Sequence, residues 1–508
     1  MTDAAHTAFE SDVLRHLDED ALVEDLASLV RVPSMGGTDA EVEVQDLCAD
    51  ILRGEGADVD RWDLDLDELM ADPWFPGTEA PRTQGVGVVG TTAGEGTPAL
   101  VLQGHLDVVP PGDPETWQGT DPFSAEIRGN ALYGRGACDM KAGVAANLAV
   151  VRTLRAAGVR LGRPLAVHCV VGEEDGGLGA FATLRRGHRG DAAVITEPTS
   201  GRIVTATAGA LTFRIEVGGR SAHGSMRREG VSAFEAFLPV YDALRALEAE
   251  RNVDPDPLFG SDLPYALSVG LVAAGDWASN VPDKLTAEGR LGVQLDEDPR
   301  QARLALEDAV AEASAKDPWL RENRPVVTWP GGQFASGRID LDHPLVEEVT
   351  AAVLDTGGAR PPLGAEVYGS DLRLYAGIGG IPTLHYGPGD IRLAHGPQEH
   401  VDLDEVVRVA RALVARAVRR CEAQAGDTPR PGTGVVTPRV PGRGAVRLGR
   451  TGGQGAASRP SAVRVTSPSA TASATARSYR SCSQKRAPTS SASRCGGCGP
   501  SVSSARRI

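Results

Sequence analysis

The sequence predicts an α/β protein that is interrupted by a smaller α+β domain. Short apolar runs alternate with helical patterns in residues 1–207 and again in 328–424, whereas residues 208–327 show another order of strands and helices. We therefore expect a main domain in two parts, an inserted domain between them, and a separate tail at 425–508.

The main domain shows strand–helix–strand alternation. Residues 21–32 have apolar side chains at helical spacing, and a second helix is predicted at 141–158. Apolar runs at 99–109, 165–174 and 192–198 end in polar residues. This alternation predicts a buried, mostly parallel sheet, whose active sites usually lie just past the carboxyl ends of the strands.

The inserted domain has a different order of predicted strands and helices. Residues 211–219 alternate as in a half-exposed strand, strands are also predicted at 266–275 and 285–295, and helices are predicted at 231–250 and 300–315. A strand–helix–strand–strand–helix–strand order fits a small antiparallel sheet with two helices on one face. The main domain then resumes and ends with a helix at 402–420.

Composition and charge exclude several classes of protein. The 508 residues are 41% hydrophobic and 24% charged, as in soluble globular proteins. No apolar run approaches the roughly 18 residues of a membrane span, and the acidic N-terminus does not resemble a secretory signal. Seven scattered cysteines do not form a disulfide framework, so a cytoplasmic location is expected.

The net charge of −16 is unevenly distributed. Residues 425–508 hold fourteen Lys and Arg against one acid, giving +13, so the remaining chain carries −29. A body this acidic would repel phosphates, which argues against nucleic-acid binding. The tail has few large apolar residues and is predicted to be disordered; a shifted reading frame is an alternative origin. Its single Cys495–Cys498 pair predicts no zinc site.

Several ionisable residues sit just past the predicted strands. His105 and Asp107 are two apart and would face one side, suiting a metal ligand and its orienting partner, although this motif alone fits a surface histidine and aspartate at a strand end better. Asp139 sits in a glycine-flanked loop that opens a helix, where it could equally be a helix cap. Adjacent Glu173 and Glu174 could divide the roles of general base and metal ligand, or form a solvated acidic turn.

Two further residues complete the set. Glu197 follows an apolar strand and precedes a proline that stops it, and His395 lies in a Gly/Pro loop, where it could equally be a surface histidine. Together the residues offer mixed histidine and carboxylate ligands, which suit Zn²⁺ or similar ions. Two such ions close together generate a hydroxide near neutral pH.

The motifs, in order, resemble those of a known enzyme family. The order H-x-D, G-x-x-D-M-K-x-G, E-E, E-P-T, S-A-H, N-x-P and A-H-x-P-x-E, from about Asp20 to Arg420, is similar to the two-metal amidohydrolases and peptidases. That family includes acetylornithine deacetylase, succinyl-diaminopimelate desuccinylase, aminoacylase, carboxypeptidase G and dipeptidases. The resemblance implies a ferredoxin-like lid and dimerisation domain, and hence a homodimer.

The resemblance also assigns roles. It implies that His105 and Glu197 bind one metal ion and that His395 and Glu174 bind the other. Asp139 would bridge both ions and have a cis bond to Met140. Glu173 would be the general base, and Asp107 would orient His105. His223 would reach the partner's site and steady an oxyanion. Asn280, Arg290, Gly369 and Ser370 match substrate-contacting positions; Arg290 could instead be a strand-surface arginine.

The implied function is hydrolysis of an amide bond in a small N-acyl amino acid, of the deacetylase or desuccinylase type, by a metal-bridged hydroxide. A dipeptidase or carboxypeptidase of the same family is the alternative. Residues 62–84 form a long insertion unlike the shortest desuccinylases. The implied cofactors are two divalent ions per subunit, zinc or cobalt. A scaffold that lost catalysis is a rival, against which the presence of both Glu173 and Glu174 argues.

Overall fold

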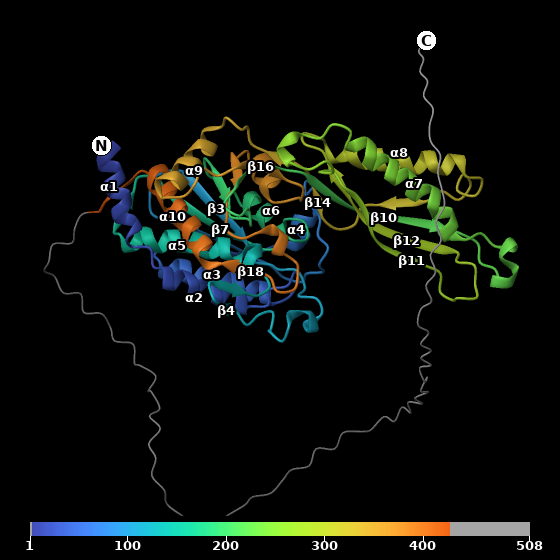
Figure 1. Ribbon diagram of the computed structural model, residues 1–508, viewed down its shortest axis with the longest axis horizontal. Helices are drawn as coiled ribbons and strands as arrows, with labels where there is room; N and C mark the ends of the chain where they lie inside the picture. The colour runs from blue at the N-terminus through green and yellow to red at the C-terminus, as the bar shows by residue number, and fades with distance from the viewer. Residues whose placement is uncertain (1–2, 427–508) are drawn as a thin grey trace, which may run out of the picture. The chain divides into compact units, whose positions relative to one another are not determined.

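A mixed sheet forms the centre of the main domain. The computed structural model describes residues 3–426, and within that range nine strands form this sheet in the order β1-β2-β7-β3-β8-β17-β9-β15, with β16 also paired to β9 (Figure 1). Their bounds are β1 Asp58–Asp63, β2 Val86–Thr91, β3 Leu100–His105, β7 Leu165–Val170, β8 Ala193–Ile195, β9 Ile203–Thr207, β15 Gly337–Arg338, β16 Leu363–Glu366 and β17 Thr383–His385.

The centre of the sheet is parallel, as the apolar strands predicted. Strand β3 pairs in parallel with both β7 and β8, and β8 pairs in parallel with β17. Strands β1 and β2 extend one side antiparallel, and β9 and β15 the other. Three neighbouring parallel strands, β7, β3 and β8, therefore end at the same edge of the sheet.

Helices cover both faces of this sheet. On β7, Leu165, Val167 and Cys169 belong to one buried cluster, whereas Ala166 and Val170 belong to another on the opposite face. The first face packs against α2, α3, α5, α9 and α10, and the second against α6. The helices are α1 Asp3–Leu14, α2 Glu19–Arg31, α3 Ala40–Gly54, α4 Leu66–Ala71, α5 Ala142–Ala156, α6 Leu178–Arg185, α9 Pro344–Asp355 and α10 Leu403–Arg420.

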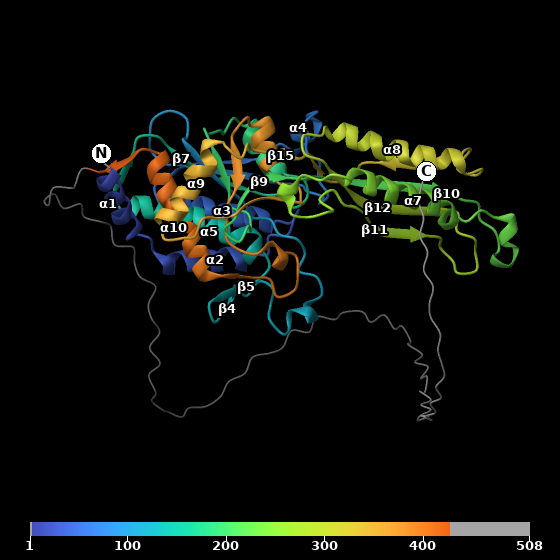
Figure 2. The same ribbon diagram turned by 45° about the horizontal axis from the view of Figure 1, so that its top comes forward.

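The inserted domain, called the lid below, has its own sheet. Within the described residues its strands lie in the order β11-β12-β10-β13, and β14 also pairs with β10 (Figure 2). The elements are β10 Gly209–Gly218, α7 Ala233–Arg251, β11 Leu267–Ala274, β12 Lys284–Val293, α8 Pro299–Lys316, β13 Val326–Thr328 and β14 Gln333–Phe334. The chain order and the antiparallel pairing match the predicted α+β lid.

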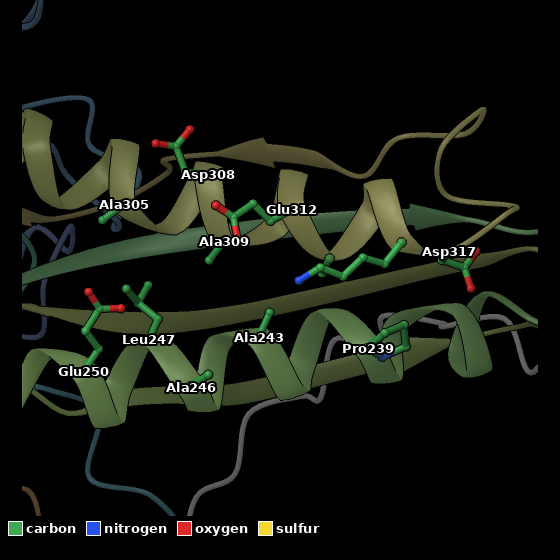
Figure 3. A pocket seen from close by; sticks show the side chains of 12 residues that line it. Pro239, Ala243, Ala246, Leu247, Glu250, Ala305, Asp308, Ala309, Glu312 and Asp317 are labelled. Carbon is green, nitrogen blue, oxygen red and sulfur yellow. The ribbon is translucent and has the colours of Figure 1, made fainter.

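The two lid helices lie side by side on one face of the sheet. Leu244 of α7 and Leu306 of α8 pack on Phe213 of β10 in the lid core. A groove of about 600 Å³ runs between the helices on their outer side, lined by small and acidic residues such as Ala246 and Glu312 (Figure 3). Its lining contains none of the predicted metal ligands, so the groove is separate from the candidate metal centre.

Smaller elements complete the described chain. Strands β4 Glu126–Arg128, β5 Ala131–Tyr133 and β18 His400–Asp402 form one sheet, and β6 Val159–Leu161 pairs with β19 Ala423–Ala425. No helix between residues 3 and 426 is long and apolar enough to cross a membrane. Residues 427–508, which hold nearly all of the predicted tail and the Cys495–Cys498 pair, lie outside the described residues.

Candidate metal centre

The central strands deliver four of the predicted residues to one edge of the sheet. His105 is the last residue of β3, Glu173 and Glu174 follow β7, and Glu197 follows β8. Because β7, β3 and β8 are neighbours with parallel pairing, their carboxyl ends adjoin. The strand order therefore explains why residues far apart in sequence meet.

Asp139 and His395 reach the same place from loops. Asp139 lies in the turn just before α5, and its bond to Met140 is cis, as the resemblance implied. Its Oδ1 lies 3.2 Å from Nε2 of His105, and its Oδ2 lies 3.4 Å from Nε2 of His395. His395 Nε2 is also 3.1 Å from a carboxylate oxygen of Glu174. The carboxylate of Asp139 thus stands between the two histidines.

Two overlapping sets of ligand atoms are close enough to hold ions. In each set the ligand atoms all lie within 4.8 Å of one another. The sets are His105 with Glu173 and Glu197, and His105 with Asp139 and Glu174. With His395, all six residues predicted as ligands or base are therefore brought together. Glu173, the neighbour of Glu174 in sequence, is close enough to His105 and Glu197 to bind an ion with them.

Asp107 supports this centre in two ways. The backbone carbonyl of Asp107 accepts a hydrogen bond from Nδ1 of His105 at 3.0 Å, so that Nε2 is directed toward Asp139 and the centre. The Asp107 carboxylate lies farther from this nitrogen, at 3.6 Å. That carboxylate instead accepts hydrogen bonds from the backbone N–H groups of Glu173 at 3.2 Å and Glu174 at 3.1 Å. Asp107 therefore holds both the histidine and the loop that carries the two glutamates.

Burial changes how readily the carboxylates of the centre ionise. Burial raises the pKa of Glu173 well above its usual range, and the charges of Glu197 and Asp371 raise it further. Burial also raises the pKa of Glu197 and of Glu174. Burial opposes ionisation of Asp139 as well, but hydrogen bonds from the two histidines outweigh it and lower that pKa. Clustered carboxylates with two histidines fit divalent cations of the zinc type.

A buried ion pair between Arg135 and Glu399, which was not predicted, supports the centre. Glu399 accepts hydrogen bonds from the backbone N–H groups of Cys138 at 3.0 Å and Asp139 at 3.1 Å, and pairs with Arg135 at 2.5 Å. Arg135 in turn donates to the carbonyl of His395 at 3.1 Å, where the backbone has the left-handed φ of 61°. The pair thus fixes both loop-borne residues. Glu399 is the last residue of the A-H-x-P-x-E motif, which was its only signal.

Two further residues near Glu173, Asp371 and Tyr368, were not predicted as site residues. Asp371 is fully buried, and its Oδ2 accepts a hydrogen bond from Gln103 at 2.9 Å. The Tyr368 hydroxyl is buried without a hydrogen-bond partner among the described residues. Burial raises the pKa of Tyr368, as do the charges of Glu197 and other nearby carboxylates, so the phenol stays protonated. A neutral hydroxyl beside the carboxylates has a hydrogen to donate in a hydrogen bond.

Among the described residues, no contact joins His223 or Asn280 to the predicted metal ligands. His223 and Asn280 face each other across an isolated bridge in the lid. His223 follows the ten-residue strand β10, so it lies about 30 Å along the lid from Gly209, at roughly 3.3 Å per residue. Arg290 of β12 instead reaches the main domain, where its Nη2 donates to the carbonyl of Val367 at 2.7 Å.

Gly369 and Ser370 lie in the same segment as Val367, between β16 and the last strands of the sheet. A side chain at Gly369 would collide with Phe334, because a Cβ there would lie 2.5 Å from the Phe334 Cβ. The Ser370 hydroxyl is buried and lies 3.1 Å from Nε2 of His385. The Ser370 hydroxyl therefore has its partner inside the protein, and the absence of a side chain at Gly369 leaves room for Phe334.

A histidine–carboxylate centre that fits divalent ions, in an α/β domain interrupted by an inserted lid, defines a class of metal-dependent hydrolases acting on amide bonds. The pattern of Peptidase family M20/M25/M40 matches residues 101–419, and the chain belongs to this family. The family resemblance seen in the motifs is thereby confirmed. Members of this family are dinuclear metal enzymes.

Relatives with assigned activities include two enzymes that remove acyl groups. N-formyl-4-amino-5-aminomethyl-2-methylpyrimidine deformylase of Bacillus subtilis is 28% identical over 397 residues, covering 74% of this chain and 89% of the relative. Succinyl-diaminopimelate desuccinylase of Stenotrophomonas maltophilia is 32% identical over 346 residues, covering 65% of this chain and 85% of the relative.

A solved structure shares the fold. The di-peptidase Dug1p of Saccharomyces cerevisiae superposes with a TM-score of 0.65 at 15% identity, covering 81% of this chain and 98% of that chain. At this identity the likeness shows the architecture alone. It supports the assignment of a sheet-based main domain with an inserted lid.

Proposed function

We propose that this protein is a deacylase that hydrolyses the amide bond of a small N-acyl amino acid. The observation that carries the proposal is the convergence of Glu173 with five histidine and carboxylate ligands at one sheet edge. The two relatives named above, a deformylase and a desuccinylase, support removal of an acyl group from nitrogen.

The proposed ligand roles are those that the family resemblance implies, and the position of Asp139 between the two histidines supports them. We assign His105 and Glu197 to one ion, His395 and Glu174 to the other, and Asp139 to both, because its two oxygens face the two histidines. Zinc, or cobalt in its place, suits this donor set. When bound, the two ions would polarise the scissile carbonyl and make water a stronger nucleophile near neutral pH.

Glu173 is the proposed proton carrier. Its carboxylate is buried, and its backbone is fixed by the hydrogen bond to Asp107, so it is held in one place beside the centre. It would take the proton from the attacking water and deliver it to the leaving nitrogen. The protonated Tyr368 hydroxyl is available to hold a substrate oxygen, and Arg290, which donates to the carbonyl of the neighbouring residue Val367, is suited to a substrate carboxylate.

A substrate panel tests this function. Treatment with a chelator should abolish amine release, and Zn²⁺ or Co²⁺ should restore it. The reconstituted enzyme should release amine from N-formyl, N-acetyl or N-succinyl amino acids faster than from dipeptides. Faster release from dipeptides would support the dipeptidase alternative, and full activity in protein free of metal by elemental analysis would contradict the whole assignment.

We further propose that the enzyme is a homodimer joined through the lids. Phe234, Leu238 and Tyr241 form an exposed apolar stripe at helical spacing on α7. Exposed Leu271 and Val272 lie on β11, an edge strand of the lid sheet within the described residues. Exposed apolar patches and open strand edges favour association with another chain. A cytoplasmic location remains a prediction from the sequence.

Subunit mixing tests whether the site is shared. His223 lies beyond the far end of β10, so it could serve the partner's centre rather than its own. Mixing inactive His223→Ala subunits with inactive Glu173→Ala subunits should then restore about a quarter to a half of the activity, since one of two sites per heterodimer is complete. No recovery after confirmed subunit exchange would show that His223 does not act across the interface.

A further inference from the structure

Part of the insertion at residues 62–84 lies between the lid and the loop that carries Glu173. We call residues Pro76–Arg82 the strap and residues Gly172–Gly177 the base loop. The strap makes hydrogen bonds to the base loop on one side and to both ends of the lid on the other.

The strap binds the base loop through a single carboxylate oxygen. Asp175, which follows Glu173 and Glu174, is 8% exposed. Four donors of the strap converge on its Oδ2: Ala80 N at 2.8 Å, Arg82 Nη1 at 2.7 Å, Thr78 Oγ1 at 3.0 Å and Glu79 N at 3.3 Å. This concentration of donors fixes the base loop relative to the strap.

Arg82 anchors the strap to the main domain. Its Nε and Nη2 donate to the two oxygens of Glu41 on α3, at 3.1 Å and 2.9 Å. The side chains of Arg82 and Glu41 are only 3% and 2% exposed. A two-pronged, buried ion pair of this kind is geometrically specific, so this end of the strap has one arrangement.

The lid side of the strap depends on Glu79. Its Oε1 accepts hydrogen bonds from Thr212 Oγ1 at 2.8 Å and from Gly332 N at 3.3 Å. The carbonyl of Pro76 accepts a third bond, from Gln333 N at 2.9 Å. Thr212 lies on β10, where the chain enters the lid, and Gln333 lies on β14, where it leaves. Glu79 is exposed, so this connection can break and re-form more readily than the buried one.

The backbones on both sides also touch. A Cβ at Gly176 of the base loop would lie 2.3 Å from the carbonyl oxygen of Gly77. Gly77 itself has a φ of 85°, and a Cβ there would lie 2.2 Å from the carbonyl oxygen of Gly331. The strap is therefore packed between two backbone segments, with no side chain in the way to absorb a shift.

We infer that the strap transmits the orientation of the lid to the base loop, and that Glu79 is a positioning residue for Glu173. The inference rests on the proposed function only in that Glu173 is taken as the base. A change in lid orientation would pull on Thr212 and Gly332, act on the strap through Glu79, and reach the base loop through Asp175.

Hydrogen exchange of the full-length protein tests the transmission without any substrate. Glu79→Ala removes the acceptor for Thr212 and Gly332, whereas Glu79→Gln keeps an oxygen there. In Glu79→Ala, amides of the base loop should exchange at least about threefold faster, although the Glu79 side chain does not bond to that loop. Glu79→Gln, and Glu95→Ala on an exposed loop, should match the wild type.

Kinetics supply the second measurement. Once a substrate is identified, Glu79→Ala should lower kcat by about tenfold, since a small displacement of a reacting group is costly, with metal content unchanged. Thr212→Val should have the same effect, and the double variant should be no worse than either single one. The exchange result stands even if no substrate is cleaved, so the two proposals fail separately.

Faster exchange confined to residues 76–82 and 331–334, with an unchanged base loop, would show that the strap does not transmit. Additive kinetic losses in the double variant would likewise show that Glu79 and Thr212 act independently. Loss of metal from Glu79→Ala would mean that the strap supports ligand Glu174 and not the base.

Discussion

Glu173→Gln should lose roughly two to four orders of magnitude in kcat while the protein keeps both metal ions, because general acid–base catalysis contributes about 10²–10⁴. Glutamine has the size of glutamate and can accept the same contacts, but it cannot take up a proton. The backbone bond from Glu173 to Asp107 does not depend on the side chain, so the loop should keep its position. Single-turnover kinetics with the cleaved substrate would measure the chemical step directly.

Metal content decides what such a loss means. A carboxylate oxygen of Glu173 lies within 4.8 Å of ligand atoms of His105 and Glu197, so the structure also allows Glu173 to bind an ion with them. If Glu173→Gln loses metal in proportion to activity, then Glu173 is a ligand and the roles of the adjacent glutamates must be exchanged. Glu43→Gln on the exposed side of α3 is the matched control and should have wild-type kcat and metal content.

The strands that carry the site could be predicted because each is an apolar run that ends in polar residues. Strands β3, β7 and β8 all begin within one residue of the predicted runs, and the helices α5 and α10 also lie where periodicity placed them. Strand direction could not be predicted in this way, because an apolar run reads alike in either direction. The antiparallel flanks of the sheet, such as the pairing of β2 with β7, depend on connections and not on the strands.

The residues that meet at the candidate centre stand in recognisable sequence motifs, whereas the residues that support them do not. His105, Asp139 and Glu197 stand in short motifs whose order matches a family. Arg82 lies in a Pro- and Gly-containing segment without periodicity, and its partners Glu41 and Asp175 are distant in sequence. Buried ion pairs of this kind depend on three-dimensional packing, so no local pattern indicates them.

The end of the inserted domain also could not be located from a local sequence pattern. The predicted inserted domain ends at residue 327, but Gln333–Phe334 still pairs with β10 before the chain rejoins the main sheet. Two residues are too few to produce a detectable alternation of apolar and polar side chains. Their position matters, because Gln333 is one of the residues that bond to the strap.

Asp139→Asn should remove metal as well as activity. The carboxylate of Asp139 faces both histidines, with Oδ1 at 3.2 Å from His105 and Oδ2 at 3.4 Å from His395, so it is the group placed to neutralise both ions. Asparagine keeps the shape but carries no charge and offers only one oxygen. Loss of an outer partner of a metal ligand typically costs about 10–100-fold in affinity, and loss of a shared charged ligand should cost more.

Elemental analysis after dialysis should therefore find far less metal in Asp139→Asn than in the wild type, together with activity near the detection limit. High added Zn²⁺ should restore part of the activity, because the other ligands, including Glu197 and His395, remain. Asp58→Asn at the exposed start of β1 is the control, and circular dichroism should show all variants folded. Full metal content in Asp139→Asn with lost activity would mean that Asp139 orients the histidines, which already bond to it, without bridging the ions.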